Sequence, residues 1–212
     1  DDLKLQLAFI KRITRNIGLP FVEDQANEAD DLIGSLCAQL RSKYICLIAS
    51  TDKDFGQLIG PRVHQVKQDK DRLWQVMSAI DVVEAIGVTP NMVSTYLALV
   101  GDSVDNIPGI DGIGEKTAPK LLEGSPSPSE LVTRIMKAKR KLPENVVRAA
   151  LALNLQLTAI REDIPVQIQR ANPNPAIIDE LNQIGAFSAV AILQRIMRAE
   201  NFKANPLPHV CV

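Results

Sequence analysis

The sequence predicts a protein of the α/β class, in which a mixed lobe of helices and short strands is followed by a helical lobe. The first observation is a helical apolar stripe that leads into the continuous apolar run 44–49, a pattern typical of a buried strand. The second is a pair of short apolar runs joined by a polar turn, which predicts a hairpin. The third is helical apolar spacing from residue 79 onward.

This spacing assigns each element in order. The mixed lobe is expected to hold helices over 3–17 and from Glu28, then strands over 44–49, 63–66 and 73–77, with Trp74 in the core. Further helices are expected over 79–86, 90–100, 115–123, 129–141 and 144–160. Because the proline-rich tract 171–175 marks a boundary before a last helical pair, we expect segments at 1–100, 101–170 and 171–212.

Composition limits the class of protein. Hydrophobic residues make up 46% and charged residues 23% of the 212 residues, as in a folded globular chain. No apolar run is long enough to span a membrane, and no secretory signal starts the chain, so we expect an intracellular protein. That means the cytoplasm of a bacterium, or an organelle or nucleus of a eukaryote, and we expect a monomer. The three cysteines lack the spacing of a zinc site or a disulfide framework.

Acidic residues gather in three clusters: Glu28, Asp30 and Asp31; Asp52 and Asp54; and Asp102 and Asp105. The first cluster begins a helix, where acids also serve as caps. The second follows the buried strand, at the end where ligands bind in open α/β sheets. Taken singly, the second can also be a solvated turn and the third a polar loop.

Together these clusters predict a metal site. If the carboxylates converge, their mutual repulsion requires cations, and hard oxygen ligands suit Mg²⁺ or Mn²⁺. About two such ions are the usual arrangement for cleaving phosphodiesters. The net charge of −1 by itself argues against a nucleic-acid partner. If these acids hold metal ions, however, the remaining surface is basic and can bind nucleic acid.

A glycine-rich stretch, residues 107–117, follows the third cluster directly. Closely spaced glycines before a helix let backbone N–H groups approach a phosphate, and Lys116 adds a positive charge. The glycine spacing differs from that of a nucleotide-binding P-loop. A plain turn between two helices remains the alternative.

The acidic clusters and the glycine stretch, in this order, resemble the 5′-3′ exonuclease domain of bacterial DNA polymerase I, within the flap endonuclease family. The matching tracts are Glu28–Asp31, Ser50–Asp54, Leu97–Gly109 and Gly112–Ala118. The resemblance implies a PIN-like (resolvase-like) sheet lobe and a helix-three-turn-helix motif at the glycine stretch. It also implies cleavage of DNA with 5′ ends or flaps at duplex junctions.

The resemblance further implies roles for single residues. Glu28, Asp30 and Asp31 would help to hold one metal ion, and Asp52, Asp54, Asp102 and Asp105 would complete paired sites. Of these acids we expect Asp31, Asp52, Asp54 and Asp102 to be catalytic. The glycine-rich stretch, called the glycine hairpin below, would grip duplex DNA, in this family often with a bound K⁺. Its candidate DNA-binding residues are Gly109, Ile110, Gly112, Ile113, Gly114, Lys116 and Thr117.

Family members begin with a strand that carries a metal-binding aspartate, followed by another acid and a basic helical arch. None of these precedes Asp1, so we expect an N-terminally truncated form. The first alternative to a nuclease is therefore a module that only binds duplex DNA. The other is a structural remnant that neither binds nor cuts DNA. A basic run on one predicted helix is a further hypothetical phosphate contact: Arg134, Lys137, Lys139, Arg140 and Lys141.

Overall fold

The structure is a computed structural model that describes residues 2–71, 73–139, 142–169, 174, 176–183, 185, 190, 194 and 209–211. The chain forms two compact units. One comprises Asp1–Glu28 with Pro165–Leu207, and the other comprises Ala29–Ile164 with Pro208–Val212. The expected segments 1–100, 101–170 and 171–212 stay a prediction.

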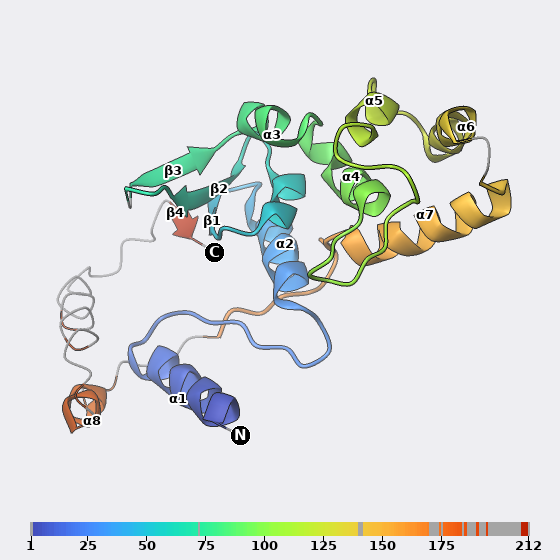
Figure 1. Ribbon diagram of the computed structural model, residues 1–212. Coiled ribbons are helices and arrows are strands. Elements are labelled where there is room, and N and C mark those ends of the chain that lie inside the picture. Colours follow the sequence, from blue (N-terminus) through green and yellow to red (C-terminus); the bar gives the residue numbers. More distant parts are fainter. Residues whose placement is uncertain are drawn as a thin grey trace. The chain divides into compact units, whose positions relative to one another are not determined.

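The larger unit contains a four-stranded sheet in the order β3-β2-β1-β4 (Figure 1). Its strands are β1 (Ile45–Ala49), β2 (Val63–Gln68), β3 (Trp74–Met77) and β4 (His209–Cys211). β1 runs parallel to β2 and β4, whereas β2 and β3 form the predicted antiparallel hairpin. The three predicted strands are confirmed, but β4 lies in a segment that we expected to be helical.

The first helix of this unit, α2 (Ala29–Leu40), packs its apolar face against β1. Cys37 from α2 joins Cys46 and Ile48 from β1 in a small core, together with Phe55 and Leu58 of the 3₁₀ helix η1 (Lys53–Leu58). The prediction of a buried strand is therefore confirmed. One prediction for the hairpin is wrong: Trp74 is 64% exposed, because it lies on β3 at the edge of the sheet.

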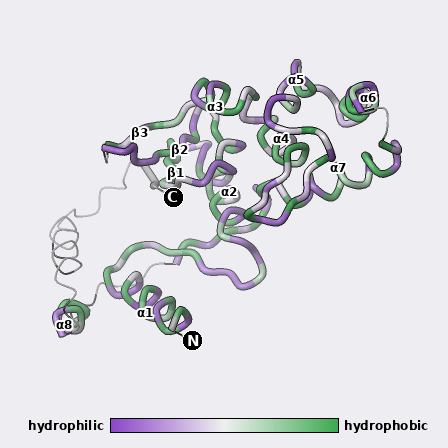
Figure 2. The backbone as a smooth tube through the Cα atoms, in the orientation of Figure 1, coloured by the Kyte–Doolittle hydropathy of each residue, from purple (hydrophilic) through white to green (hydrophobic). Residues whose placement is uncertain are grey.

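The predicted helical region is confirmed and forms a second, larger core. It consists of α3 (Ala79–Ile86), η2 (Pro90–Met92), α4 (Val93–Val100), α5 (Ala118–Leu122), α6 (Pro128–Ala138) and α7 (Glu144–Thr158). In Figure 2 the tube of α4 is mostly in the hydrophobic colours, and its Leu97 and Leu99 are buried. Two side chains of α7 tie it to α4: Asn154 donates to the Ala98 carbonyl and Thr158 to the Ser94 carbonyl, each at 2.9 Å.

The smaller unit contains α1 (Asp2–Asn16) and α8 (Ala176–Gln183). Ile17 packs with Ile177, Leu181 and Val190 in a third core. The expected helix over 3–17 is confirmed, although its residues Leu3 and Ile10 are exposed. Of the expected last helical pair, α8 is confirmed, and most of the second helix lies outside the described residues.

Among the described residues, no single helix has the length and apolar character required to cross a membrane. The segments Ala79–Ile86 and Pro90–Val100 meet that requirement only as a pair, with a bend of 48° between them. Both contribute buried residues to the larger core, such as Val82 and Leu99.

Candidate metal centre

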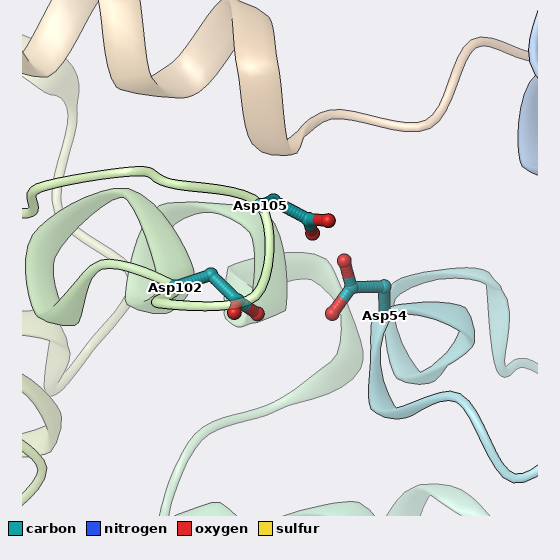
Figure 3. A group of neighbouring side chains, drawn as sticks. All are labelled: Asp54, Asp102 and Asp105. Carbon is teal, nitrogen blue, oxygen red and sulfur yellow. The ribbon is translucent and has the colours of Figure 1, made fainter.

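Three of the predicted metal ligands meet in the larger unit. Asp54, Asp102 and Asp105 each present a carboxylate oxygen, and these oxygens lie within 4.8 Å of one another. Figure 3 shows Asp54 approaching from one segment while Asp102 and Asp105 approach from another. We call these three residues the acid cluster. Asp102 is buried, Asp54 is half-buried and Asp105 is exposed, so the cluster opens toward solvent on one side.

The loop that carries Asp102 and Asp105 is held closed by its own backbone. The backbone N–H of Asp102 donates to the Ile107 carbonyl at 2.9 Å, and the Ile107 N–H donates back at 2.7 Å. Gly101 and Gly109, both with positive φ, lie against each other at the neck of the loop. A Cβ on Gly101 would come within 2.8 Å of the Gly109 nitrogen, so only glycine permits this approach.

The segment that carries Asp54 is fixed by hydrogen bonds at the end of β1. Asp52 caps η1, and its Oδ1 accepts from the Asp54 backbone N–H at 3.0 Å. The buried Gln65 on β2 donates to the backbone carbonyls of Ser50 at 2.9 Å and Asp52 at 2.5 Å. Asp52 therefore positions Asp54, and it does not belong to the acid cluster itself.

The charges within the cluster are unequally compensated. Burial, with the nearby Asp52 carboxylate, raises the pKa of Asp54 to about 6. A hydrogen bond from Lys53 instead lowers the pKa of Asp102, because the Lys53 ammonium lies 2.7 Å from Asp102 Oδ2. The same contact raises the pKa of Lys53.

The donor set fits a divalent cation. Oδ1 of Asp54 is buried and has no hydrogen-bond partner among the described residues. A buried carboxylate oxygen without a partner is costly, and a bound cation would relieve that cost. The three donors are all carboxylate oxygens, which suit Mg²⁺ and similar hard ions. Asp54, Asp102 and Asp105 are thus the residues that would hold the metal.

The acids at the start of α2 are used differently. Oδ1 of Asp31 accepts a hydrogen bond from the Arg161 backbone N–H at 2.8 Å. Ser35 and Gln39 follow on the same helix face and bond to residues 161 and 164. Together, Asp31, Ser35 and Gln39 bind segment 161–164 to α2, so Asp31 has a structural partner. Asp30 is half-buried in the first turn of α2, and neither it nor Asp31 belongs to the acid cluster.

Glu28 belongs to the smaller unit, and its role as a metal ligand stays a prediction.

The glycine hairpin divides into a buried part and an exposed part. Gly109 lies against Val100, and the side chains of Ile110 and Ile113 belong to the larger core, so DNA could contact these positions only through their backbone. Of the candidate DNA-binding residues, the exposed ones are Gly112, Gly114 and Lys116. Thr117 is half-buried and is the N-cap residue of α5, which starts three residues later than the predicted 115–123 helix.

The basic run on α6 is only partly available for phosphates. The Arg134 guanidinium donates to the carbonyls of Leu121 and Glu123 and pairs with Glu130, so this residue is structural. Lys137 is exposed, and the Lys139 ammonium lies beside Gly112. Arg140 and Lys141 lie outside the described residues.

Sequence reasoning gave no role to Lys53, although this residue pairs with the acid cluster. The available signal was its position between two aspartates, in a tract already assigned to a metal site.

Two family profiles match the chain in succession. The profile described as 5′-3′ exonuclease, N-terminal resolvase-like domain, matches residues 1–87. The profile described as 5′-3′ exonuclease, C-terminal SAM fold, matches residues 88–181. The resolvase-like sheet lobe and the helical lobe expected from the sequence are both confirmed.

Relatives of known name agree. The chain is 35% identical over 172 residues to DNA polymerase I of Rhizobium leguminosarum, covering 79% of this chain and 17% of that protein. It is 34% identical over 169 residues to a 5′-3′ exonuclease of Aquifex aeolicus, covering 79% of this chain and 57% of that protein. The chain thus spans little more than half of the second relative, and far less of the first.

A solved structure of the bacteriophage T5 flap endonuclease, in complex with DNA and metal ions, has a similar fold. The TM-score is 0.51 at 20% identity, covering 81% of this chain and 59% of that chain. The two matching profiles and the named relatives lead to one conclusion: the chain belongs to the 5′-3′ exonuclease family.

Proposed function

We propose that this chain hydrolyses phosphodiester bonds in DNA from 5′ ends or 5′ flaps, with Mg²⁺ or Mn²⁺ held by the acid cluster. The observation that carries this proposal is the buried Oδ1 of Asp54, which has no hydrogen-bond partner in the described part of the chain and lies beside the carboxylates of Asp102 and Asp105. Such an oxygen-rich site, partly open to solvent, can hold a hard cation at a position that a DNA phosphate can reach.

Each part of the site has a distinct task in this proposal. When bound, divalent ions activate water and neutralise charge on the phosphate and the leaving oxygen. Asp54, Asp102 and Asp105 provide the ligands, while Asp52 orients Asp54 through its backbone N–H. Cleavage would leave a 5′-phosphate on the released fragment and a 3′-hydroxyl on the other side.

The substrate class is proposed from the exposed part of the glycine hairpin and from the relatives. Gly112, Gly114 and Lys116 are exposed, which suits contact with a sugar-phosphate backbone. One relative is named a 5′-3′ exonuclease, and one similar structure is a flap endonuclease with DNA. A K⁺ ion at the hairpin, a second divalent ion and a monomeric state also belong to the proposal.

A second candidate function is binding of duplex DNA without cleavage. It is favoured by one observation: of the seven acids predicted as metal ligands, the cluster found among the described residues contains Asp54, Asp102 and Asp105. A single ion can be bound there while a second site, needed for hydrolysis, is incomplete.

The experiment that separates these functions uses the chain with a 5′-flap DNA duplex, labelled at the flap. We expect cleavage with Mg²⁺ that EDTA abolishes and that the Asp102→Asn substitution reduces by at least about 100-fold. Lys43→Met, which lies just before β1 and at the far end of that strand from the cluster, is a control and should cleave normally. Binding without any Mg²⁺-dependent cleavage would favour the second candidate, and loss of binding as well would refute both.

A further inference from the structure

We propose that Lys53 is a DNA-phosphate contact that the divalent ion releases: Asp102 holds its ammonium in the metal-free chain, and metal binding to Asp102 frees it for the substrate. The inference rests on the proposed function, because it requires DNA to bind at the acid cluster. It assigns a DNA-binding role to Lys53, which was not among the predicted site residues.

The geometry places Lys53 as a removable cation. Its side chain is 60% exposed, yet its ammonium lies 2.7 Å from Oδ2 of Asp102, which is only 7% exposed. The pair therefore joins a solvent-facing lysine to the most buried carboxylate of the cluster. Lys53 is also adjacent in sequence to Asp54, so η1 carries the lysine and one ligand of the cluster on neighbouring residues.

The ammonium and a divalent ion compete for the same carboxylate. An ion bound by the acid cluster would draw on Asp102 oxygens and would repel the positively charged ammonium beside it. Lysine has a long, flexible stem and three rotatable donors, so it can move without disturbing the backbone of η1. Lys53 can therefore exchange its partner when the metal binds.

A DNA phosphate is the partner that suits the released ammonium. A phosphate at the metal lies beside Asp102, within reach of a lysine that was bonded to Asp102 before. The alternative partner is Asp52, which lies near enough to affect the pKa of Lys53, but its Oδ1 already accepts from the Asp54 N–H. A phosphate contact would strengthen DNA binding, whereas a move to Asp52 would not.

The test compares wild type and Lys53→Met for binding of a 5′-flap DNA, measured by fluorescence anisotropy in Ca²⁺ and in EDTA. Gel analysis confirms that the DNA stays intact. Because the substitution removes the same charge in both conditions, the difference between the two effects isolates the change of partner. We expect Lys53→Met to weaken binding about 5- to 10-fold more in Ca²⁺ than in EDTA. In Ca²⁺ alone, the substitution should also reduce the slope of log affinity against log salt concentration by about the amount of one phosphate contact.

A second arm needs no metal. In the Asp102→Asn background, Lys53 loses its charged partner, so Lys53→Met should weaken DNA binding in EDTA by the factor seen for wild type in Ca²⁺. Lys53→Arg keeps the charge and should retain most of the affinity, and Lys43→Met should behave as wild type throughout. Circular dichroism verifies that each variant is folded.

The outcomes distinguish this inference from the proposed function. If wild type binds flap DNA in Ca²⁺ but Lys53→Met has equal effects in both conditions, Lys53 stays on Asp102 or moves to Asp52, and only this inference is overturned. If wild type does not bind flap DNA at all, the proposed function fails and the inference fails with it.

Discussion

Two acidic clusters of the larger unit differ in what their carboxylates contact. At the start of α2, Asp31 accepts a hydrogen bond from the Arg161 backbone and so holds segment 161–164 in place. At the end of β1, Asp54 has a buried oxygen, beside Asp102 and Asp105, that has no hydrogen-bond partner in the part of the chain that the structure describes. The difference teaches that one oxygen of Asp31 contributes to the fold, whereas the buried oxygen of Asp54 is available to a cation.

The largest effect should come from removing a ligand of the acid cluster. Asp102→Asn keeps the shape of the side chain but removes its charge, so we expect Mn²⁺ to bind at least about tenfold more weakly, since a charged oxygen ligand is lost. Isothermal titration calorimetry measures this directly. A variant that binds Mn²⁺ as wild type does would show that Asp102 is not a ligand.

The neck of the Asp102 loop should be the next most sensitive position. Gly109→Ala places a Cβ 2.6 Å from the Val100 carbonyl group at a φ of +69°, so we expect a loss of about 2–4 kcal/mol in the free energy of unfolding. Gly114→Ala is the matched control, because its Cβ would meet no atom of the described residues within 4 Å. Urea denaturation of both variants checks this, and equal stabilities would contradict the account of the neck.

Asp31 should affect stability more than metal binding. Asp31→Ala removes the acceptor for the Arg161 N–H, so we expect a loss of about 1–2 kcal/mol on urea denaturation. Asp31→Ala should lower the Mn²⁺ affinity by less than Asp102→Asn does. The reverse order would mean that the cluster at α2 is the metal site, as the sequence alone allowed.

The smallest effect concerns the thiols under α2. Burial raises the pKa of Cys37 to about 12 and also raises that of Cys46, so at pH 8 little thiolate forms at these two residues in the folded chain. In a Cys211→Ser variant, iodoacetamide should therefore react very slowly until urea unfolds the chain. Rapid alkylation of the folded chain would show that α2 separates readily from β1.

Much of the fold was predictable because apolar periodicity reports which face of each element is buried. The runs at 44–49 and 90–100 are examples, since both lie in cores. Trp74 was misjudged because hydrophobicity does not reveal that its strand lies at an edge. β4 was missed because only its pairing with β1, far away in sequence, identifies it as a strand.

The candidate site was predictable only in part. The rule that ligands gather at strand ends pointed to Asp54, and its meeting with Asp102 follows from the fold. Local sequence could not show that Asp31 bonds to residue 161, or that Gly109 closes the neck of a loop. Such contacts join positions far apart in the chain, so spacing carries no sign of them.

The most direct test of the central claim is a crystal structure of the chain with Mn²⁺, located by its anomalous scattering. The account predicts an ion bound by oxygens of Asp54, Asp102 and Asp105 at about 2.0–2.3 Å, the range for hard cations with oxygen ligands. An ion bound at Asp30 and Asp31 instead, with Lys53 still paired to Asp102 and the acid cluster without metal, would contradict it.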